Sequence, residues 1–215
     1  MSLYSQGDAE VSRRGKLDTA GCIQGLCREA NQSEGNGMVG VQIGAKPDSG
    51  FNDPIGMLKD CHRRIENFLQ ILCLVAERAR GRRLTDEEAT AVNASLSYFR
   101  AGGQRHTADE EESLFPRLKK QLSSDEVEQL HRLEDDHERA NELHAEIEEL
   151  YHIWMESGLL SEHNEKILTQ SVTELEGIYK AHIKVEEEVV FPQASRTLDP
   201  KAVEAMGQEF RARRT

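Results

Sequence analysis

Apolar residues recur at alternating steps of three and four along four long stretches of the chain, at about 54–80, 85–114, 124–157 and 162–190. This spacing keeps one face of a helix turned toward its neighbours, so each stretch is predicted to be an amphipathic helix. The joints between them are short, which favours antiparallel neighbours and an all-α, up-down-up-down four-helix bundle. A short fifth helix is expected at about 199–212.

Local signals indicate where these helices begin and end. Asp53-Pro54 and Asp199-Pro200 each supply an N-cap followed by a proline in the first turn. Capping boxes open the second and third helices. Phe115-Pro116 and Phe191-Pro192 are predicted to stop or kink the helices that precede them.

The chain changes character near residue 52. Residues 1–52 hold more than half of the sixteen glycines and no sustained apolar period, which predicts a flexible, poorly ordered N-terminal arm. The bundle is expected over 53–195, and 196–215 form the short C-terminal helix that packs on the bundle or trails it. Cys22 and Cys27 in the arm are interpreted as ordinary exposed thiols. Regulation of the bundle, docking of a protein partner and no role at all stay open for the arm.

Composition then removes several classes of function. Lys+Arg 27 against Asp+Glu 39 gives a net charge of −12, so nucleic acid and anionic membrane surfaces would be repelled. The apolar runs are too short for a transmembrane helix, and no secretory leader is recognised. Four cysteines form no dense disulfide framework, and a cytoplasmic protein is therefore expected.

Histidines interrupt the apolar seams, two of them followed one turn later by a glutamate. Counted from the predicted helix ends, these histidines lie at similar depths, about 12 Å in from one end of the bundle, with the third helix's histidine somewhat deeper. Burying so many ionisable groups without partners costs several kcal/mol, so a cation is expected among them. The six seam residues are His62, His106, Glu110, His137, His182 and Glu186.

Two stretches, 106–116 and 182–192, share the pattern H-x3-E-E-E-x-[LV]-F-P. A histidine and a glutamate four residues apart lie on one helix face, so the imidazole can bind one metal ion while the carboxylate spans to a second. Imidazole and carboxylate without thiolate suit iron or manganese. The following glutamates (Glu111, Glu112, Glu187 and Glu188) are interpreted as a solvated acidic face.

These motifs, together with Asp60-Cys61-His62 and Asp135-Asp136-His137, resemble the hemerythrin-like (HHE cation-binding) family of non-haem di-iron four-helix bundles. The resemblance covers about 54–192. It implies two iron ions with an oxo or hydroxo bridge, which manganese or zinc can replace, and dioxygen or nitric oxide as the small ligand. By the same likeness, the four seam histidines are terminal iron ligands and Glu110 and Glu186 are bridging carboxylates.

One position departs from the family pattern. Oxygen-carrying hemerythrins place a further histidine one turn after the third helix's histidine, and this chain has Asn141 there. The departure puts reversible oxygen carriage in doubt. Glu134, His144 or a water are the alternatives for the missing ligand.

The resulting prediction is a metal- and oxygen-binding protein for sensing, storage or stress response, with no catalytic residue assigned. The alternative is a di-iron enzyme: a peroxidase, an oxidase or a protein that repairs iron–sulfur centres. A ferritin-like oxidase is disfavoured because Glu-x-x-His spacing occurs only in the third helix, for example at Glu128/His131 and Glu134/His137. A helical scaffold with a vestigial site would not explain six polar seam residues.

Overall fold

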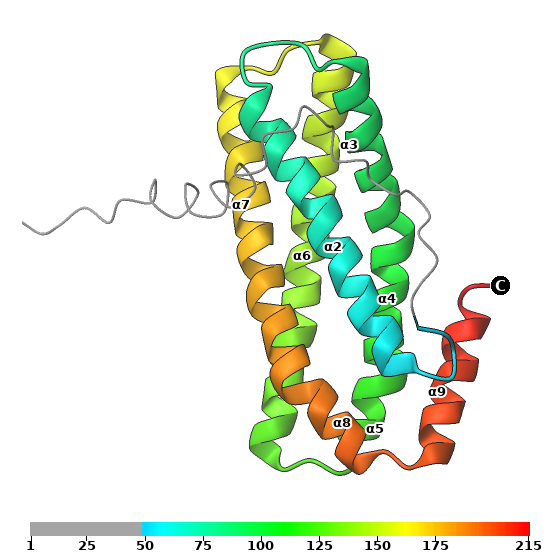
Figure 1. The fold of residues 1–215 in the computed structure, drawn as a ribbon. Helices are drawn as coiled ribbons and strands as arrows, with labels where there is room; N and C mark the ends of the chain where they lie inside the picture. Colours follow the sequence, from blue (N-terminus) through cyan, green and yellow to red (C-terminus); the bar gives the residue numbers. More distant parts are fainter. Residues whose placement is uncertain (1–48) are drawn as a thin grey trace, which may run out of the picture. The chain divides into compact units, whose positions relative to one another are not determined.

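The structure is a computed structural model that describes residues 49–215, so Cys22, Cys27 and all but the last residues of the predicted N-terminal arm lie outside it. Within the described residues the chain is helical and contains no β-strand. Four long helical rods lie side by side and a shorter helix packs beside one end of them (Figure 1). The predicted all-α bundle is confirmed.

Two of the rods are single helices and two are interrupted by π-helical segments. The first rod is α2 (Pro54–Arg78), and the third is α6 (Ser124–Ser157). The second rod comprises α3 (Asp86–Tyr98), η1 (Phe99–Gly103), α4 (Gln104–Asp109), η2 (Glu110–Leu114) and α5 (Phe115–Leu118). The fourth comprises α7 (Glu162–Val185), η3 (Glu186–Val190) and α8 (Phe191–Thr197), and α9 (Pro200–Ala212) follows it.

The predicted helix starts have the local contacts that their sequences suggest. The Asp53 side chain accepts a hydrogen bond from the backbone N–H of Gly56, and Pro54 occupies the first turn of α2. Capping boxes open α3 and α6, and α6 ends at Gly158, whose φ of 78° is left-handed. These helix ends are therefore defined by local features: N-cap side chains, capping boxes and a left-handed glycine.

The two Phe-Pro pairs do not stop the helices, so of the two predicted effects, a stop or a kink, the stop is wrong. A proline in a regular α-helix clashes with the carbonyl four residues earlier and lacks the N–H that would bond to it. Here the N–H of Phe115 bonds to the carbonyl of Glu110, five residues back, and the N–H of Phe191 bonds to that of Glu186. The wider π turn makes room for the proline ring, and each rod continues as α5 or α8.

The π turns also shift the buried face by one residue. The alternating steps of three and four in the fourth helix, continued beyond Glu186, would place Val189 on the buried face. In the structure Val189 is 45% exposed and Val190 is buried. One extra residue per turn explains the difference, since the face that follows η3 begins one position later than a 3.6-residue period requires.

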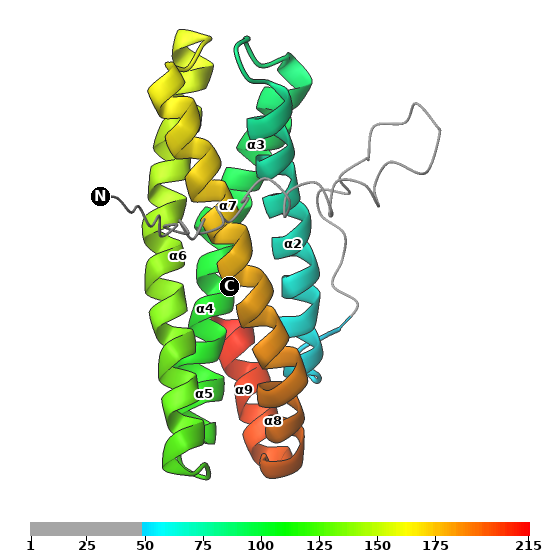
Figure 2. The same cartoon turned by 90° about the vertical axis from the view of Figure 1, so that its left-hand side faces the viewer.

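Figures 1 and 2 show α9 beside one end of the bundle. A large apolar core closes this end. Phe210 and Met206 of α9 are fully buried in it, beside Phe115 of α5 and Phe191 of α8. The short C-terminal helix thus packs on the bundle. Among the described residues, no helix is long and apolar enough to cross a membrane.

Gly207 tests how closely α9 is docked. A Cβ at this position would overlap the backbone carbonyl of Phe51, at the start of the described chain. Gly207→Ala is therefore expected to lower the free energy of unfolding by about 1–3 kcal/mol, as overpacking does. The matched control is Gly177→Ala in α7, where a Cβ meets nothing within 4 Å and the helix should gain about 0.5–1 kcal/mol. Chemical denaturation measures both, and an equal gain at the two sites would contradict the close packing of α9.

Candidate metal centre

Six polar side chains project into the core from all four rods, near the end at which α9 packs. None of them is more than 6% exposed, and the two glutamates are completely buried. They are the six residues that the apolar seams singled out. The structure brings all of them together: His62 from α2, His106 from α4, Glu110 from η2, His137 from α6, His182 from α7 and Glu186 from η3.

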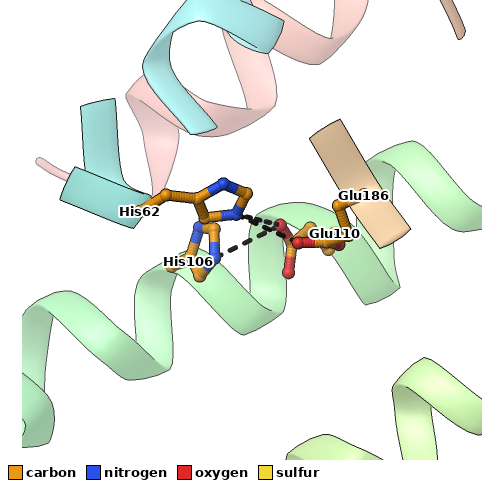
Figure 3. Close-up of side chains that lie close together, drawn as sticks. All are labelled: His62, His106, Glu110 and Glu186. Carbon is orange, nitrogen blue, oxygen red and sulfur yellow. Dashed lines mark ion pairs between the residues drawn. The ribbon is translucent and has the colours of Figure 1, made fainter. Parts of the chain in front are cut away.

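Their ligating atoms form two groups, each with all atoms within 4.8 Å of one another. The first group, drawn in Figure 3, contains His62, His106, Glu110 and Glu186. His62 Nε2 lies 3.0 Å from Glu186 Oε2, and His106 Nε2 lies 3.3 Å from Glu110 Oε1. Two imidazoles and two carboxylates thus converge on a single point between α2, α4, η2 and η3.

The second group contains Glu110 again, with His137 and His182. His137 Nε2 lies 3.4 Å from Glu110 Oε2, the oxygen that the first group does not use, and His182 Nε2 lies 3.4 Å from Glu186 Oε2. Both carboxylates therefore lie between one pair of imidazoles and the other. Glu110 faces the two groups with different oxygens, as a carboxylate that bridges two cations needs, whereas Glu186 lies near His62 and His182 through the same oxygen, Oε2.

Two imidazoles are held in orientation by the rod that faces them. Glu187 Oε1 lies 2.9 Å from His62 Nδ1, and the ring of Phe191 stacks on the same imidazole at 5.4 Å between centroids. Glu111 Oε1 likewise lies 2.8 Å from His137 Nδ1, and Phe115 stacks on that ring at 6.4 Å. A carboxylate on Nδ1 fixes the tautomer and leaves Nε2 free to bind a metal.

The interpretation of Glu111 and Glu187 as a solvated acidic face is therefore wrong. Each is only half-exposed, and each occupies the position directly after a buried glutamate, where it reaches a histidine of another rod. The repeat alone does not reveal this role, because both copies carry the third glutamate as well as the second. Glu112 and Glu188 are exposed, as predicted.

The other two imidazoles have weaker support. His182 Nδ1 lies 3.4 Å from Asp136 Oδ2, on the turn of α6 just before His137. His106 Nδ1 has no hydrogen-bond partner among the described residues. The four histidines are thus equivalent in their Nε2 contacts and unequal in what holds their rings.

The residues considered for the missing ligand lie elsewhere. Asn141 is exposed on α6 and faces away from the core. Both carboxylate oxygens of Glu134 accept hydrogen bonds from Lys119 Nζ, at 2.6 and 2.8 Å. His144 Nε2 lies 3.0 Å from the hydroxyl of Tyr179, with its ring against Phe99. Neither Glu134 nor His144 belongs to the two groups.

Burial and the neighbouring charges shift the pKa values of the side chains in the centre. Burial, together with the nearby charge of Glu186, raises the pKa of Glu110 to about 7. Burial would also raise the pKa of Glu186, but His182 and His62 outweigh it and hold that pKa well below its usual range. Burial lowers the pKa of His106 well below its usual value, so this imidazole is neutral.

Protons on the remaining imidazoles offset the buried carboxylates. Burial alone would lower the pKa of His137, but Glu110 and Glu111 outweigh it and raise that pKa to about 9. The pKa of His182 rises to about 10 because Glu186 and Asp136 likewise overcome the effect of burial. In the metal-free chain, imidazolium ions therefore supply the positive charge at the centre.

The unsatisfied atoms fit a metal cation. Both oxygens of Glu110, both oxygens of Glu186, and Nε2 of His62 and of His182 are buried without an aligned hydrogen bond among the described residues. Buried polar atoms normally have partners, and orphans of this kind require an explanation. A cation in each group would give each of these four residues a partner, and imidazole with carboxylate is a donor set that transition metals accept.

The raised pKa values predict how the stability of the metal-free protein depends on pH. A histidine whose folded pKa lies above its unfolded value near 6.5 stabilises the fold fully below that value, and this contribution is lost as pH rises through the folded pKa. With His137 near 9 and His182 near 10, we expect the melting temperature of metal-free protein to fall by several degrees between pH 7 and 10. Calorimetry of chelator-treated protein checks this, and a rise over that range would contradict it.

Comparison with known proteins agrees with this geometry. A protein of Haemophilus influenzae described as an uncharacterized protein is 31% identical over 169 residues, which span 76% of this chain and 91% of that protein. The family model described as the hemerythrin HHE cation binding domain matches residues 53–194, the four rods that carry the centre. The chain therefore belongs to the hemerythrin HHE cation-binding family.

Proposed function

We propose that this protein holds two iron ions in the buried centre and uses them to bind dioxygen or nitric oxide, for sensing, storage or stress response. One observation carries the proposal: two groups of imidazole and carboxylate atoms share Glu110, and every member of both groups is buried. A single metal ion would need only one of these groups. The membership of the chain in a cation-binding family supports the same conclusion.

The ligands divide evenly between the two ions. His62 and His106 would bind one iron and His137 and His182 the other, with Glu110 and Glu186 shared between them. Nitrogen and oxygen donors suit iron and manganese, and zinc is a possible substitute. The buried thiol of Cys61 precedes His62 in α2 but belongs to neither group.

Each ion would keep positions that no side chain fills. Two imidazoles and two shared carboxylates supply four donors, whereas iron commonly accepts more. The described residues add no further histidine, cysteine or carboxylate to either group. Iron bound here supplies electron transfer and open positions for a diatomic ligand.

The surrounding side chains prepare the centre for that chemistry. Glu187 and Glu111 orient His62 and His137, which lowers the reorganisation needed when a metal enters. Phe191 and Phe115 cover those imidazoles and exclude water from the carboxylates. Because His137 and His182 are protonated in the metal-free chain, metal binding must release protons and should tighten as the pH rises.

Metal analysis of anaerobically purified protein tests the proposal directly. We expect about two iron ions per chain, as in di-iron carboxylate bundles, and a charge-transfer absorption that changes on exposure to air. His106→Ala should lose most of the iron, because it removes one of the two imidazoles of the first group. His163→Ala, an exposed histidine at the other end of α7, is the matched control and should keep it. Less than half an equivalent of any transition metal in the wild-type protein would overturn the proposal.

Glu187 provides a second test that leaves all six proposed ligands in place. Glu187→Gln weakens the contact that orients His62, so the affinity for ferrous iron should fall about tenfold, as for other residues that orient metal ligands. Glu188→Gln changes the neighbouring exposed residue of the same charge and should leave the affinity unchanged. Competition with a chelator measures both constants. Equal affinities for the two variants would show that the Glu187 contact does not support the centre.

A further inference from the structure

The C-terminal helix α9 lies beside the second rod (Figures 1 and 2). It contacts α4 and η2, the two segments that carry His106 and Glu110. It also contacts α2, which carries His62. The helix therefore touches the three segments that supply His62, His106 and Glu110 of the first ligand group.

Two arginines directly after α9, Arg213 and Arg214, make an ionic contact with Asp109. This carboxylate is completely buried, and it directly precedes Glu110 in the chain. Arg213 donates to Asp109 Oδ1 at 2.9 Å, and Arg214 donates to Asp109 Oδ2 at 2.6 Å. We call Asp109, Arg213 and Arg214 the clasp. Two guanidinium groups on one buried carboxylate form a short, charge-assisted set of hydrogen bonds.

Further bonds join α9 to the π segment η2. The second guanidinium nitrogen of Arg213 donates to the hydroxyl of Ser113, at 2.9 Å. Arg117 of α5 pairs with Glu209 of α9 at 2.6 Å and also donates to the carbonyl of Ser113, at 2.7 Å. Residues before, within and after η2 are thus tied to α9 or to a side chain that α9 holds.

Comparison of the two copies of the repeated motif shows that only the copy at 106–116 has the polar residues that contact Arg213 and Arg214. When His106 is aligned with His182, Asp109 corresponds to Val185 and Ser113 corresponds to Val189. Val189 is 45% exposed, whereas Ser113 is buried against α9. The polar residues that the arginines need are therefore present only in the copy that α9 covers.

We infer that α9 positions Glu110 and His106 for metal binding by holding Asp109 through Arg213 and Arg214. This inference rests on the proposed function. Asp109 lies three residues after His106 and one before Glu110, so a displacement of its backbone moves both proposed ligands. A π turn has poorer hydrogen-bond geometry than an α-helix, which makes its position dependent on contacts with the rest of the fold.

The clasp should act unequally on the two metal ions. The first group draws two of its members, His106 and Glu110, from the clasped stretch, and the second group draws only Glu110. Loosening the clasp should therefore release the ion held by His62 and His106 first. Glu110 and Arg213 make no direct contact among the described interactions, so Arg213 and Arg214 are positioning residues and not ligands.

The test compares metal release from full-length iron-loaded variants into excess ferrous chelator. Arg213→Ala/Arg214→Ala should release one of two ions about tenfold faster than the wild type, as loss of an orienting partner does elsewhere, and the second ion nearly as slowly as before. Arg213→Lys/Arg214→Lys keeps the charges and should recover most of the slow release. Lys201→Ala, an exposed cation in the first turn of α9, is the matched control and should behave as the wild type.

A second control separates positioning from general stability. Leu84→Ala removes a buried side chain at the opposite end of the bundle and should lower the melting temperature without changing the release rate. Hydrogen exchange of metal-free protein adds a readout that needs no iron: amides of 110–118 should exchange faster in the arginine variant only. If the double variant does not fold, Asp109→Asn, which keeps the size and removes the charge, is measured in the same way.

The outcomes separate this inference from the proposed function. Two ions in the wild type and unchanged release from the arginine variant would overturn the role of the clasp and leave the di-iron proposal standing. If Leu84→Ala releases iron as fast as the arginine variant, the role of the clasp is likewise overturned, because general loss of stability would then explain the release. A wild-type chain that binds no metal would overturn the proposed function and, with it, the role assigned to the clasp.

Discussion

The structure depends on the burial of two carboxylates, Glu110 and Glu186, beside each other in the core of the bundle. Neither charge can be sustained there without a positive partner, since desolvation of an unpaired carboxylate costs several kcal/mol. In the metal-free chain that partner is a set of protonated imidazoles, as the raised pKa values of His137 and His182 indicate. The four rods, the π turns and the rings stacked on the histidines all serve to hold these groups at one level of the bundle.

The repeated H-x3-E-E-E-x-[LV]-F-P motif can now be explained residue by residue. Its histidine and first glutamate point into the centre, and its second glutamate and its phenylalanine contact a histidine of another rod. The proline follows a π turn that lets the rod continue past it. Each motif therefore supplies two proposed ligands and also fixes the orientation of a third.

Sequence periodicity was sufficient to identify the bundle and the six buried polar residues, because a polar residue on an apolar seam stands out and the helix caps are local. It failed where the geometry is not that of a regular α-helix. The exposed Val189 and the continuation of the rods past Pro116 and Pro192 both follow from π turns, which no 3.6-residue count reveals. Glu111 and Glu187 were misassigned because their partners are distant in sequence, and the same distance conceals the contacts of Arg213 and Arg214 with Asp109.

His62 is oriented by Glu187 of η3, and His137 by Glu111 of η2, so each ring depends on another rod. This dependence has a consequence for the order of folding and metal binding. The first rod carries a histidine whose ring is oriented only after the fourth rod has docked, and the third rod depends on the second in the same way. No pair of sequence-adjacent rods contains a complete ligand group. Binding of the proposed metal ions would therefore follow tertiary assembly, because a nascent or half-folded chain does not yet bring either group together.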